Sequence, residues 1–359
     1  MKLLEKLSGL FLFLMLTYSK NKLTLERGGV LMTITTKKID WGSFVQKALN
    51  GERLSLEEGL QILHAEEDQM LPMLNASFRV RHHFFAKKVK LNMIFNAKSG
   101  ACQEDCGYCS QSKVSDAPVK TYSLLDKETL VAGAKEALAR KASTYCIVTS
   151  GRSPSEKEIN EIVEAVREIS ETLPLKICTS LGILNEARAR QLKEAGVARY
   201  NHNLNTHEDN YKNITSTHTY NDRVLTVESI KSIGISPCSG CIVGLGESDE
   251  QIVEMAYALR DLDADSIPVN FLHPVEGTPL GNYESPKPYK ALKVLALMRF
   301  INPSKEIRIS GGREKSLRHL QPLALYAANS IFVGDYLTTA GQEVNKDYEM
   351  IEDLGFEIE

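Results

Sequence analysis

The stretch that decides the fold is residues 89–109, VKLNMIFNAKSGACQEDCGYC, where a strand candidate leads into three cysteines. The strand candidate is Val89–Asn96, and Cys102, Cys106 and Cys109 follow it with the spacing Cys-x3-Cys-x2-Cys. Thiolates are soft ligands that favour iron–sulfur clusters, zinc or copper(I). A structural zinc site or an electron-transfer ferredoxin usually closes all four ligand positions. Three local thiols therefore indicate a cubane cluster with one iron open to a small molecule.

Beyond this stretch the chain alternates between short β-branched runs and helical segments. The further strand candidates are Thr144–Thr149, Leu175–Thr179, Ala198–Leu204, Ile235–Val243, Ser266–Phe271, Glu306–Ser310 and Ser330–Val333. The helical stretches between them include Lys127–Arg140, Ser155–Thr172, Glu186–Ala195, Asn221–Ile233, Asp249–Asp261 and Lys287–Ile301. Eight β/α units over about 245 residues predict an α/β fold, a closed (β/α)8 barrel of the TIM type. A doubly wound open sheet is the alternative, but no Gly-x-Gly-x-x-Gly follows the first strand.

The N-terminal part of the chain differs from the rest. An apolar run, Leu10–Leu16, is too short to span a membrane, and no small-residue cleavage site follows it. We interpret the start as a non-native or disordered extension with translation beginning at Met32, and a disordered or membrane-touching tail is the alternative. Ser55 and Glu58 are expected to form a helix-capping box. The predicted boundaries are 1–31 for the extension, 32–88 for an N-terminal helical segment, 89–340 for the barrel and 341–359 for a C-terminal tail.

The composition is that of a soluble globular protein, with 43% hydrophobic and 25% charged residues. The net charge of −3 and the lack of a basic block give no sign of nucleic-acid binding. Seven cysteines form an odd set that does not resemble a secreted disulfide framework. A reducing, cytoplasmic location is therefore expected, because thiols are available there as ligands.

Polar residues at alternate positions mark the inside of the predicted barrel. The active site of such a barrel sits at the C-terminal ends of its strands, which is where the cysteine triplet falls. Asn201, Asn203 and Asn205 share one face by the period-two rule, and later strands carry Asn270 and Arg308. A buried arginine without a partner is costly. A lumen that holds ligands accounts for these residues better than a core of Val, Ile and Leu.

Three further cysteines, Cys146, Cys178 and Cys238, lie on separate strand candidates. A single buried cysteine usually packs as a small hydrophobic residue. Three on different strands of one barrel, with Arg308 on a fourth, would converge in the lumen if they face inward. Such a site is unusual, because an arginine is nearly always protonated and is a poor ligand.

The Cys-x3-Cys-x2-Cys triplet resembles the signature of the radical S-adenosylmethionine (SAM) superfamily. The resemblance implies an iron that chelates the amino and carboxylate groups of SAM. It also implies a 5′-deoxyadenosyl radical that removes hydrogen from unactivated carbon, chemistry that the cofactor carries. Chance cysteines or a zinc knuckle are the alternatives for the spacing alone.

The strand cysteines make the resemblance specific to the biotin synthase family, which holds a [2Fe–2S] cluster with three strand cysteines and one arginine. The resemblance covers roughly residues 40 to 355. The matching motifs are CQEDCGYC at 102–109, YNHNLNT at 200–206, CSGCIVGLGE at 238–247, RISGGRE at 308–314 and ANSIF at 328–332.

Carried over by position, the resemblance implies two cluster sites, a SAM site and a substrate site. The [4Fe–4S] cluster, whose open iron takes SAM, would be held by Cys102, Cys106 and Cys109. The [2Fe–2S] cluster would be held by Cys146, Cys178, Cys238 and Arg308, and Arg308 would act catalytically as a weak ligand. SAM would contact Tyr108, Ile242, Asn205 and the turn Gly240–Glu247 with Gly244. Asn203 and Asn270 would lie between SAM and the substrate, with Asn201 toward the substrate ring.

Two positions depart from the family pattern. The family commonly has Asp where this chain has Asn205, so a charge-assisted bond to the SAM ribose would be lost. Cys241 stands where Gly is common, and on a regular strand it points away from Cys238, so it is expected to pack. By the same period His202 would be satisfied outside the lumen. The pair His82-His83 is expected on a helix surface.

The implied reaction converts dethiobiotin to biotin, with two SAM cleavages and the [2Fe–2S] cluster as sulfur donor. The resemblance also implies flavodoxin or ferredoxin as electron donor, iron–sulfur assembly proteins as partners, and a homodimer. One alternative is another radical enzyme on the same barrel, such as a hydrogenase-cofactor maturase or a lysine mutase relative. The other is a non-catalytic iron–sulfur carrier, although a carrier needs no amide-lined cavity.

Overall fold

The computed structural model describes residues 16–19, 22–27, 30–35 and 39–359, and the chain splits into two units, Met1–Trp41 and Gly42–Glu359. In the first unit, β1 (Leu16–Ser19), β2 (Lys22–Arg27) and β3 (Val30–Thr35) form an antiparallel sheet in that order. Met32 thus lies in a strand, where a helical segment was expected to begin. The start of translation at Met32 stays a prediction, and residues 10–15 of the apolar run lie outside the described residues.

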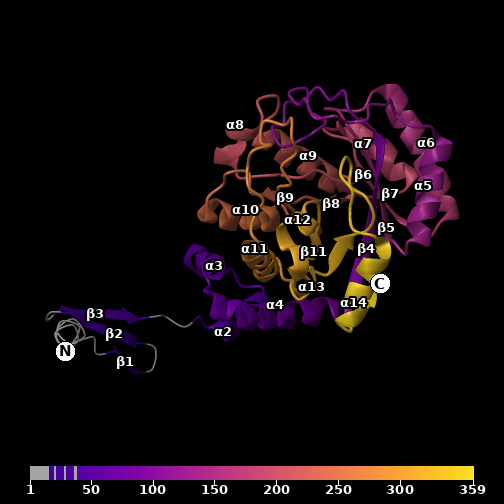
Figure 1. Ribbon diagram of the computed structural model, residues 1–359. Coiled ribbons are helices and arrows are strands. Elements are labelled where there is room, and N and C mark those ends of the chain that lie inside the picture. Colours follow the sequence, from indigo (N-terminus) through magenta and orange to yellow (C-terminus); the bar gives the residue numbers. More distant parts are fainter. Residues whose placement is uncertain (1–15, 20–21, 28–29, 36–38) are drawn as a thin grey trace, which may run out of the picture. The chain divides into compact units, whose positions relative to one another are not determined.

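Three helices precede the barrel: α2 (Trp41–Leu49), α3 (Leu56–Leu63) and α4 (Met70–Phe85). The predicted capping box begins α3, because Ser55 Oγ accepts from Glu58 N at 3.1 Å and Glu58 Oε2 accepts from Ser55 N at 2.8 Å. The α4 residue Arg81 is fully buried and donates to the carbonyls of Lys88 and Ala328. Helix α4 is therefore anchored beside the starts of two barrel strands (Figure 1).

The barrel is a closed sheet of eight parallel strand positions in the part of the chain that the structure describes, as predicted. The strands are β4 (Lys88–Lys98), β5 (Thr144–Thr149), β6 (Lys176–Ser180), β7 (Val197–Asn201), β8 (Ser236–Cys238) with β9 (Cys241–Val243), β10 (Ser266–Phe271), β11 (Glu306–Ile309) and β12 (Ser330–Phe332). Pairing of Ser330 with Lys90 joins β12 to β4 and closes the barrel.

The fifth strand differs from the prediction, since Ser239 and Gly240 interrupt it and divide it into β8 and β9. A Cβ at Gly240 would lie 1.9 Å from the carbonyl oxygen of Pro268, so the chain approaches β10 more closely than any side chain allows. The fourth strand also ends earlier than predicted, at Asn201. Both breaks occur where residues turn toward the mouth of the barrel.

Helices surround the strands on the outside (Figure 1). The long ones are α5 (Lys127–Ala139), α6 (Glu156–Thr172), α7 (Glu186–Ala195), α9 (Tyr220–Ser232), α10 (Asp249–Asp261), α11 (Pro288–Ile301) and α14 (Val344–Asp353). A buried ion pair fixes helix α14 to α12 (Arg313–Leu317). Asp347 Oδ1 of α14 lies 2.8 Å from Arg313 Nη2 of α12. After α14, β13 (Glu357–Ile358) pairs with the start of β4. The predicted C-terminal tail therefore carries regular structure.

Strand residues alternate between an apolar outer face and a polar inner face. On β11, Ile307 and Ile309 are buried beneath the helices, whereas Glu306 and Arg308 belong to the polar interior. The main apolar core thus lies between strands and helices, which leaves the lumen for polar groups. In the described ranges, no helix is both long and apolar enough to cross a bilayer.

Candidate active site

The loop that follows β4 carries the first three cysteines at the carboxyl end of the barrel. Cys106 is buried, and Cys102 and Cys109 are partly buried. Two neighbouring loops hold the middle of the cysteine loop, because Gly107 N donates to Ile214 O at 2.8 Å and Leu280 N donates to Gly107 O at 3.1 Å. The three thiols are therefore held on a fixed loop at the rim; we call Cys102, Cys106 and Cys109 the rim set.

Asp105, between two rim cysteines, clamps this loop to the segment 215–217. Its Oδ1 accepts from Thr215 Oγ1 at 2.7 Å, Ser216 N at 2.9 Å and Thr217 Oγ1 at 3.0 Å. Burial opposes the carboxylate, but these hydrogen bonds outweigh it and hold the Asp105 pKa well below its usual range. Asp105 is therefore an ionised structural anchor beside the rim set.

A chain of three side chains links the same loop to the cavity. Arg223 Nη2 lies 2.9 Å from His218 Nε2, and His218 Nδ1 lies 2.7 Å from Glu104 Oε2. Because the guanidinium can only donate, Nε2 accepts and Nδ1 carries the proton that Glu104 accepts. Burial first and Arg223 second lower the His218 pKa, which favours this neutral tautomer. Glu104 and His218 thus orient Arg223.

The central cavity has a volume of about 300 Å³ and extends into the barrel. Most of the predicted cofactor and substrate residues form its wall: Tyr108, Asn201, Asn203, Asn205, Ile242 and Asn270. Gly244 is not part of the wall; it has a φ of 105°, a left-handed backbone conformation that explains a glycine in this turn. Cys146 and Arg308 also line the cavity, so it reaches the strand cysteines.

An apolar and aromatic edge forms one side of the cavity. Tyr108 and Ile242 pack against a small cluster of buried aliphatic residues, Ile214, Leu245, Leu272 and Leu280. Asn205, with a φ of 70°, donates from Nδ2 to the Tyr108 hydroxyl at 2.8 Å. Asn is among the few residues that adopt this left-handed conformation readily. The three residues Tyr108, Asn205 and Ile242 therefore make a surface suited to a flat ring.

The carboxamides below this edge are held in place by their neighbours. Asn203 Oδ1 accepts from Asn201 Nδ2 and from Gly240 N, both at 3.1 Å. Asn270 donates to Cys241 O at 3.0 Å and accepts from Gly311 N at 3.0 Å. Asn201 also lies with its Nδ2 3.2 Å from Cys238 Sγ. The amides thus connect the cavity to the cysteines beneath.

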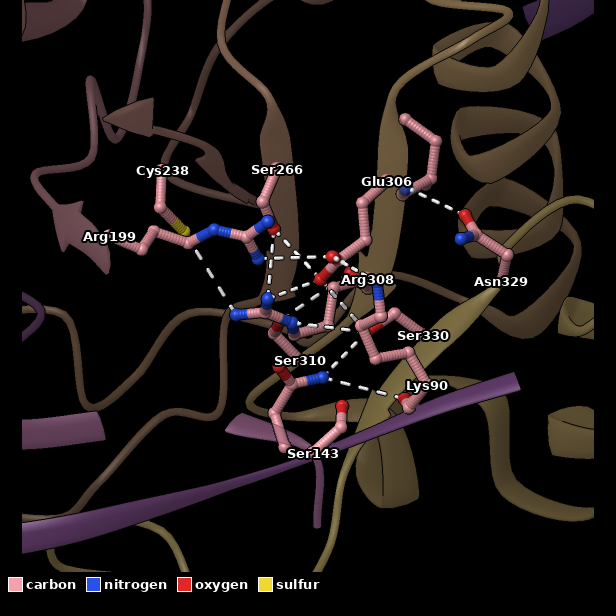
Figure 2. Close-up of polar contacts among 12 residues, drawn as sticks. Lys90, Ser143, Arg199, Cys238, Ser266, Glu306, Arg308, Ser310, Asn329 and Ser330 are labelled. Atoms are coloured by element: carbon pink, nitrogen blue, oxygen red, sulfur yellow. Dashed lines mark hydrogen bonds and ion pairs between the residues drawn. The ribbon is translucent and has the colours of Figure 1, made fainter. Parts of the chain in front are cut away.

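The strand cysteines form a second set inside the barrel. Cys146 of β5 and Cys178 of β6 are register partners, and Cys238 on β8 lies opposite Asn201. Arg308 is 3% exposed and places Nη1 4.0 Å from Cys238 Sγ (Figure 2). The structure therefore brings Cys146, Cys178, Cys238 and Arg308 together, and we call these four residues the deep set.

Several residues of the site were missed by the sequence analysis. Arg223 on α9 lines the cavity, and its Nε has no hydrogen-bond partner among the described residues. Leu337 reaches the wall from the loop after β12, held by its carbonyl on Asn96 Nδ2 at 2.8 Å. Arg199 and Glu306 lie beside the deep set, because Glu306 pairs with both Arg199 and Arg308. They share the period-two face of Asn201 and Arg308, respectively, so the same alternation could have found them.

Of the three histidines considered in the sequence analysis, two lie where they were expected and one does not. His82 and His83 are exposed on α4, as expected. His202 contradicts its prediction, because it lines the cavity and its Nε2 has no partner in the part of the chain described. The reason is that β7 ends at Asn201, so strand alternation no longer applies. Burial lowers the pKa of His202 well below its usual value, so the ring is neutral.

Thiolates are soft ligands that suit iron–sulfur clusters, zinc or copper(I). Within the described residues, no group of three or more His, Cys, Asp or Glu side chains is arranged to hold a metal ion. Burial raises the pKa of Cys109 to about 12, so the thiolate form of this side chain would depend on a nearby positive charge such as that of a bound metal. Cys241 is fully buried and lies outside the cavity wall, consistent with packing.

Comparison with known proteins agrees with this geometry. A Radical SAM superfamily model matches residues 97–259, and a model of the Biotin and Thiamin Synthesis associated domain matches residues 268–357. Biotin synthase of Bacillus pumilus is 64% identical over 321 residues, 89% of this chain and 97% of that protein. Biotin synthase of Bacillus cytotoxicus is 61% identical over 322 residues, 90% of this chain and 97% of that protein.

Solved structures show the same fold at low identity. Methylornithine synthase (PylB) has a TM-score of 0.78 at 20% identity, over 88% of this chain and 97% of its own. The FeFe-hydrogenase maturase HydG from Carboxydothermus hydrogenoformans has a TM-score of 0.75 at 19% identity, over 89% of this chain and 79% of its own.

The barrel, its rim set and the superfamily match define a radical SAM enzyme, which uses a [4Fe–4S] cluster and SAM. Within that class the identity to curated relatives over nearly their whole length is decisive. The chain belongs to the biotin synthase family.

Proposed function

We propose that this enzyme converts dethiobiotin to biotin, with a [4Fe–4S] cluster on the rim set and a [2Fe–2S] cluster on the deep set. The observation that carries the proposal is the deep set itself: three thiols from three strands beside Arg308, joined by Asn201 to an amide-lined cavity. When bound, SAM and the first cluster supply a 5′-deoxyadenosyl radical, and the second cluster supplies the sulfur. The remaining steps of the proposal concern what the chain's own residues do.

The SAM molecule would bind between the rim set and the carboxamides. Tyr108 and Ile242 would support the adenine, and Asn205 would contact the ribose. Asn205 can donate and accept, but it lacks the charge of the aspartate that the family commonly has there. The Gly240–Glu247 turn would back this surface, which the packing of Tyr108 and Ile242 against Leu245 supports.

Arg223 would bind the carboxylate of SAM. It is the cation of the upper cavity, and its Nε has no partner among the described side chains and backbone groups. A charge-assisted hydrogen bond to a carboxylate would satisfy it. Glu104 and His218 would hold Arg223 in the orientation described above, and so tie carboxylate binding to the loop of the rim set.

The substrate would lie between SAM and the deep set. Asn201, Asn203 and Asn270 offer both donors and acceptors, which matches the N–H and C=O groups of a ureido ring. The hydrogen bond between Asn201 and Asn203, and those of Asn203 and Asn270 to backbone groups, support a preformed site. Such a position would bring the substrate carbons toward the sulfur source.

The proposal includes partners that the reaction needs. Each SAM cleavage consumes one electron, so we propose flavodoxin or ferredoxin as donor, and iron–sulfur assembly proteins to load the clusters. The free thiols of both sets require a reducing compartment, so we place the enzyme in the cytoplasm. A homodimer also remains part of the proposal.

The test is anaerobic reconstitution, reduction in the presence of SAM and dethiobiotin, and detection of products by mass spectrometry. We expect biotin and two molecules of 5′-deoxyadenosine for each biotin formed. Deoxyadenosine without biotin would contradict the proposal that dethiobiotin is the substrate, and it would favour another radical enzyme on this barrel. Neither product from protein shown to hold both clusters would contradict the proposal and favour an iron–sulfur carrier.

A further inference from the structure

A buried carboxylate lies among three cations at the floor of the deep set (Figure 2). Glu306 is 5% exposed. Its Oε2 lies 3.0 Å from Arg199 Nη1 and 3.6 Å from Lys90 Nζ. Its Oε1 accepts from Ser266 Oγ at 3.0 Å, and also from Arg308 Nη2. One carboxylate therefore joins side chains from β4, β7, β10 and β11.

The hydrogen bonds of Arg308 leave one guanidinium nitrogen for the cysteines. Nη2 donates to Glu306 and to Ser266 Oγ at 2.8 Å, and Nε donates to Ser330 Oγ at 3.3 Å. Nη1 is the nitrogen directed at Cys238 Sγ, 4.0 Å away. A guanidinium is a planar fork, so fixing two of its nitrogens fixes the direction of the third.

Glu306 also compensates the positive charges of the three cations around it. Arg199, Arg308 and Lys90 would repel one another in a buried floor, and an unpaired buried charge is strongly unfavourable. The Glu306 carboxylate lies 3.0 Å from Arg199 Nη1 and 3.6 Å from Lys90 Nζ, and it accepts from Arg308. Each of the three cations therefore has a counter-charge within the same buried network.

We propose that Glu306 is a positioning residue of the deep set. Glu306 holds Arg308 with Nη1 directed toward the three thiols, and it also forms an ion pair with Arg199. This inference rests on the proposed function, because the [2Fe–2S] cluster belongs to that proposal. Glu306 itself would touch neither cluster nor substrate. It acts through Arg308, whose orientation decides whether a nitrogen donor faces the cluster.

The first test compares Glu306→Gln with Asp347→Asn. Both changes remove a buried carboxylate that binds an arginine, but Asp347 pairs with Arg313, away from the cysteines. After anaerobic reconstitution, Mössbauer spectra and iron and sulfide analysis would count each cluster type. We expect Glu306→Gln to lose at least half of the [2Fe–2S] cluster and keep the [4Fe–4S] cluster. Asp347→Asn should keep both, even with a lowered melting temperature.

A second variant separates positioning from charge balance. The double change Arg199→Met with Glu306→Gln removes one cation with the anion, so the net charge of the floor is unchanged and folding is less affected. Arg308 still loses its anchor, so we expect the [2Fe–2S] content to stay low and the residual cluster to show an altered Mössbauer quadrupole splitting. Arg199→Met alone should keep most of the cluster, because Glu306 still holds Arg308.

Three outcomes would overturn the inference. One is wild-type [2Fe–2S] content and spectrum in Glu306→Gln; another is an equal loss of that cluster in Asp347→Asn. The third is full recovery in the double variant, which would reduce Glu306 to a counter-charge. If the unaltered protein itself takes up no [2Fe–2S] cluster, the proposed function fails and the inference fails with it. If the unaltered protein holds both clusters and only the variants give one of these three outcomes, the inference is wrong and the proposed function is unaffected.

Discussion

The rim set and the deep set hold the same number of thiols but are built in opposite ways. The rim set comes from eight consecutive residues on a loop, and side-chain clamps such as Asp105 hold that loop to its neighbours. The deep set comes from four strands, and strand register with a buried charge network holds it. A loop can accommodate an exchangeable ligand, whereas a barrel floor gives a rigid frame.

This difference explains what each set requires around it. The rim set is partly exposed and sits beside the cavity, where Arg223 is a cation available to an incoming anion. The deep set lies below the carboxamides, where the buried charges need counter-charges such as that of Glu306. We therefore expect that damage to one set leaves the other set intact, and four groups of variants test this expectation.

The largest effects should come from single cysteines of the two sets. Cys106→Ala should abolish SAM cleavage, because a rim cluster with two thiolates loses a ligand. Cys178→Ala should abolish biotin formation but leave SAM cleavage and the [4Fe–4S] cluster in place. Measuring deoxyadenosine and biotin for both variants would decide. Loss of SAM cleavage in Cys178→Ala would contradict the claim that the two sets fail independently of each other.

Next in size is the loss of Arg223. Arg223→Met should weaken SAM binding by about 10- to 150-fold, since a hydrogen bond to a charged group contributes about 1.5–3 kcal/mol. His218→Gln should have a smaller effect, about threefold to tenfold, from roughly 1 kcal/mol of lost orientation. Equilibrium binding of SAM to reconstituted protein would measure both. Lys231→Met, an exposed cation on the same helix, is the control and should bind SAM normally.

Asp105→Asn should loosen the rim loop without touching the deep set. The amide keeps the shape but loses the ionised acceptor, at an expected cost of about 1–3 kcal/mol. We expect faster loss of the [4Fe–4S] cluster to a chelator, with the [2Fe–2S] cluster lost at the normal rate. Asp116→Asn alters an exposed carboxylate of the same loop and should change neither rate. Equal acceleration at both clusters would show that the sets are not independent.

The smallest effect is expected for Cys241→Ala. The side chain is fully buried and is not part of the cavity wall, so its loss should cost about 1 kcal/mol of unfolding free energy. Iron content of both clusters should be unchanged. A loss of iron like that of Cys178→Ala would mean that Cys241 is a ligand after all.

The same contrast separates what the sequence could predict from what it could not. The spacing predicted the rim set, because its three cysteines are close in sequence, although the spacing alone left chance cysteines or a zinc knuckle as alternatives. The barrel followed from the alternation of strands and helices, and the deep set from cysteines on separate strands. Arg199 and Glu306 lie on the same alternating faces, which could have placed them in the lumen, but no local pattern shows that they pair with each other. Their role appears only when β7 and β11 are placed around one floor.

Other features depended on tertiary contacts that no local pattern carries. The break at Gly240 arises from the approach of Pro268 on another strand. His202 enters the cavity because β7 ends at Asn201, the residue directly before it. Arg223 is placed by a helix, and Leu337 by a loop that follows the last strand. Such residues come from the connections, where strand periodicity gives no information.

The most direct test of the central claim is to follow both clusters by Mössbauer spectroscopy during a single turnover, while biotin is counted in the same sample. We expect that one [2Fe–2S] cluster is lost for each biotin formed and that the [4Fe–4S] signal remains. Biotin formed with the [2Fe–2S] cluster intact would contradict it, because the sulfur would then come from elsewhere than the deep set.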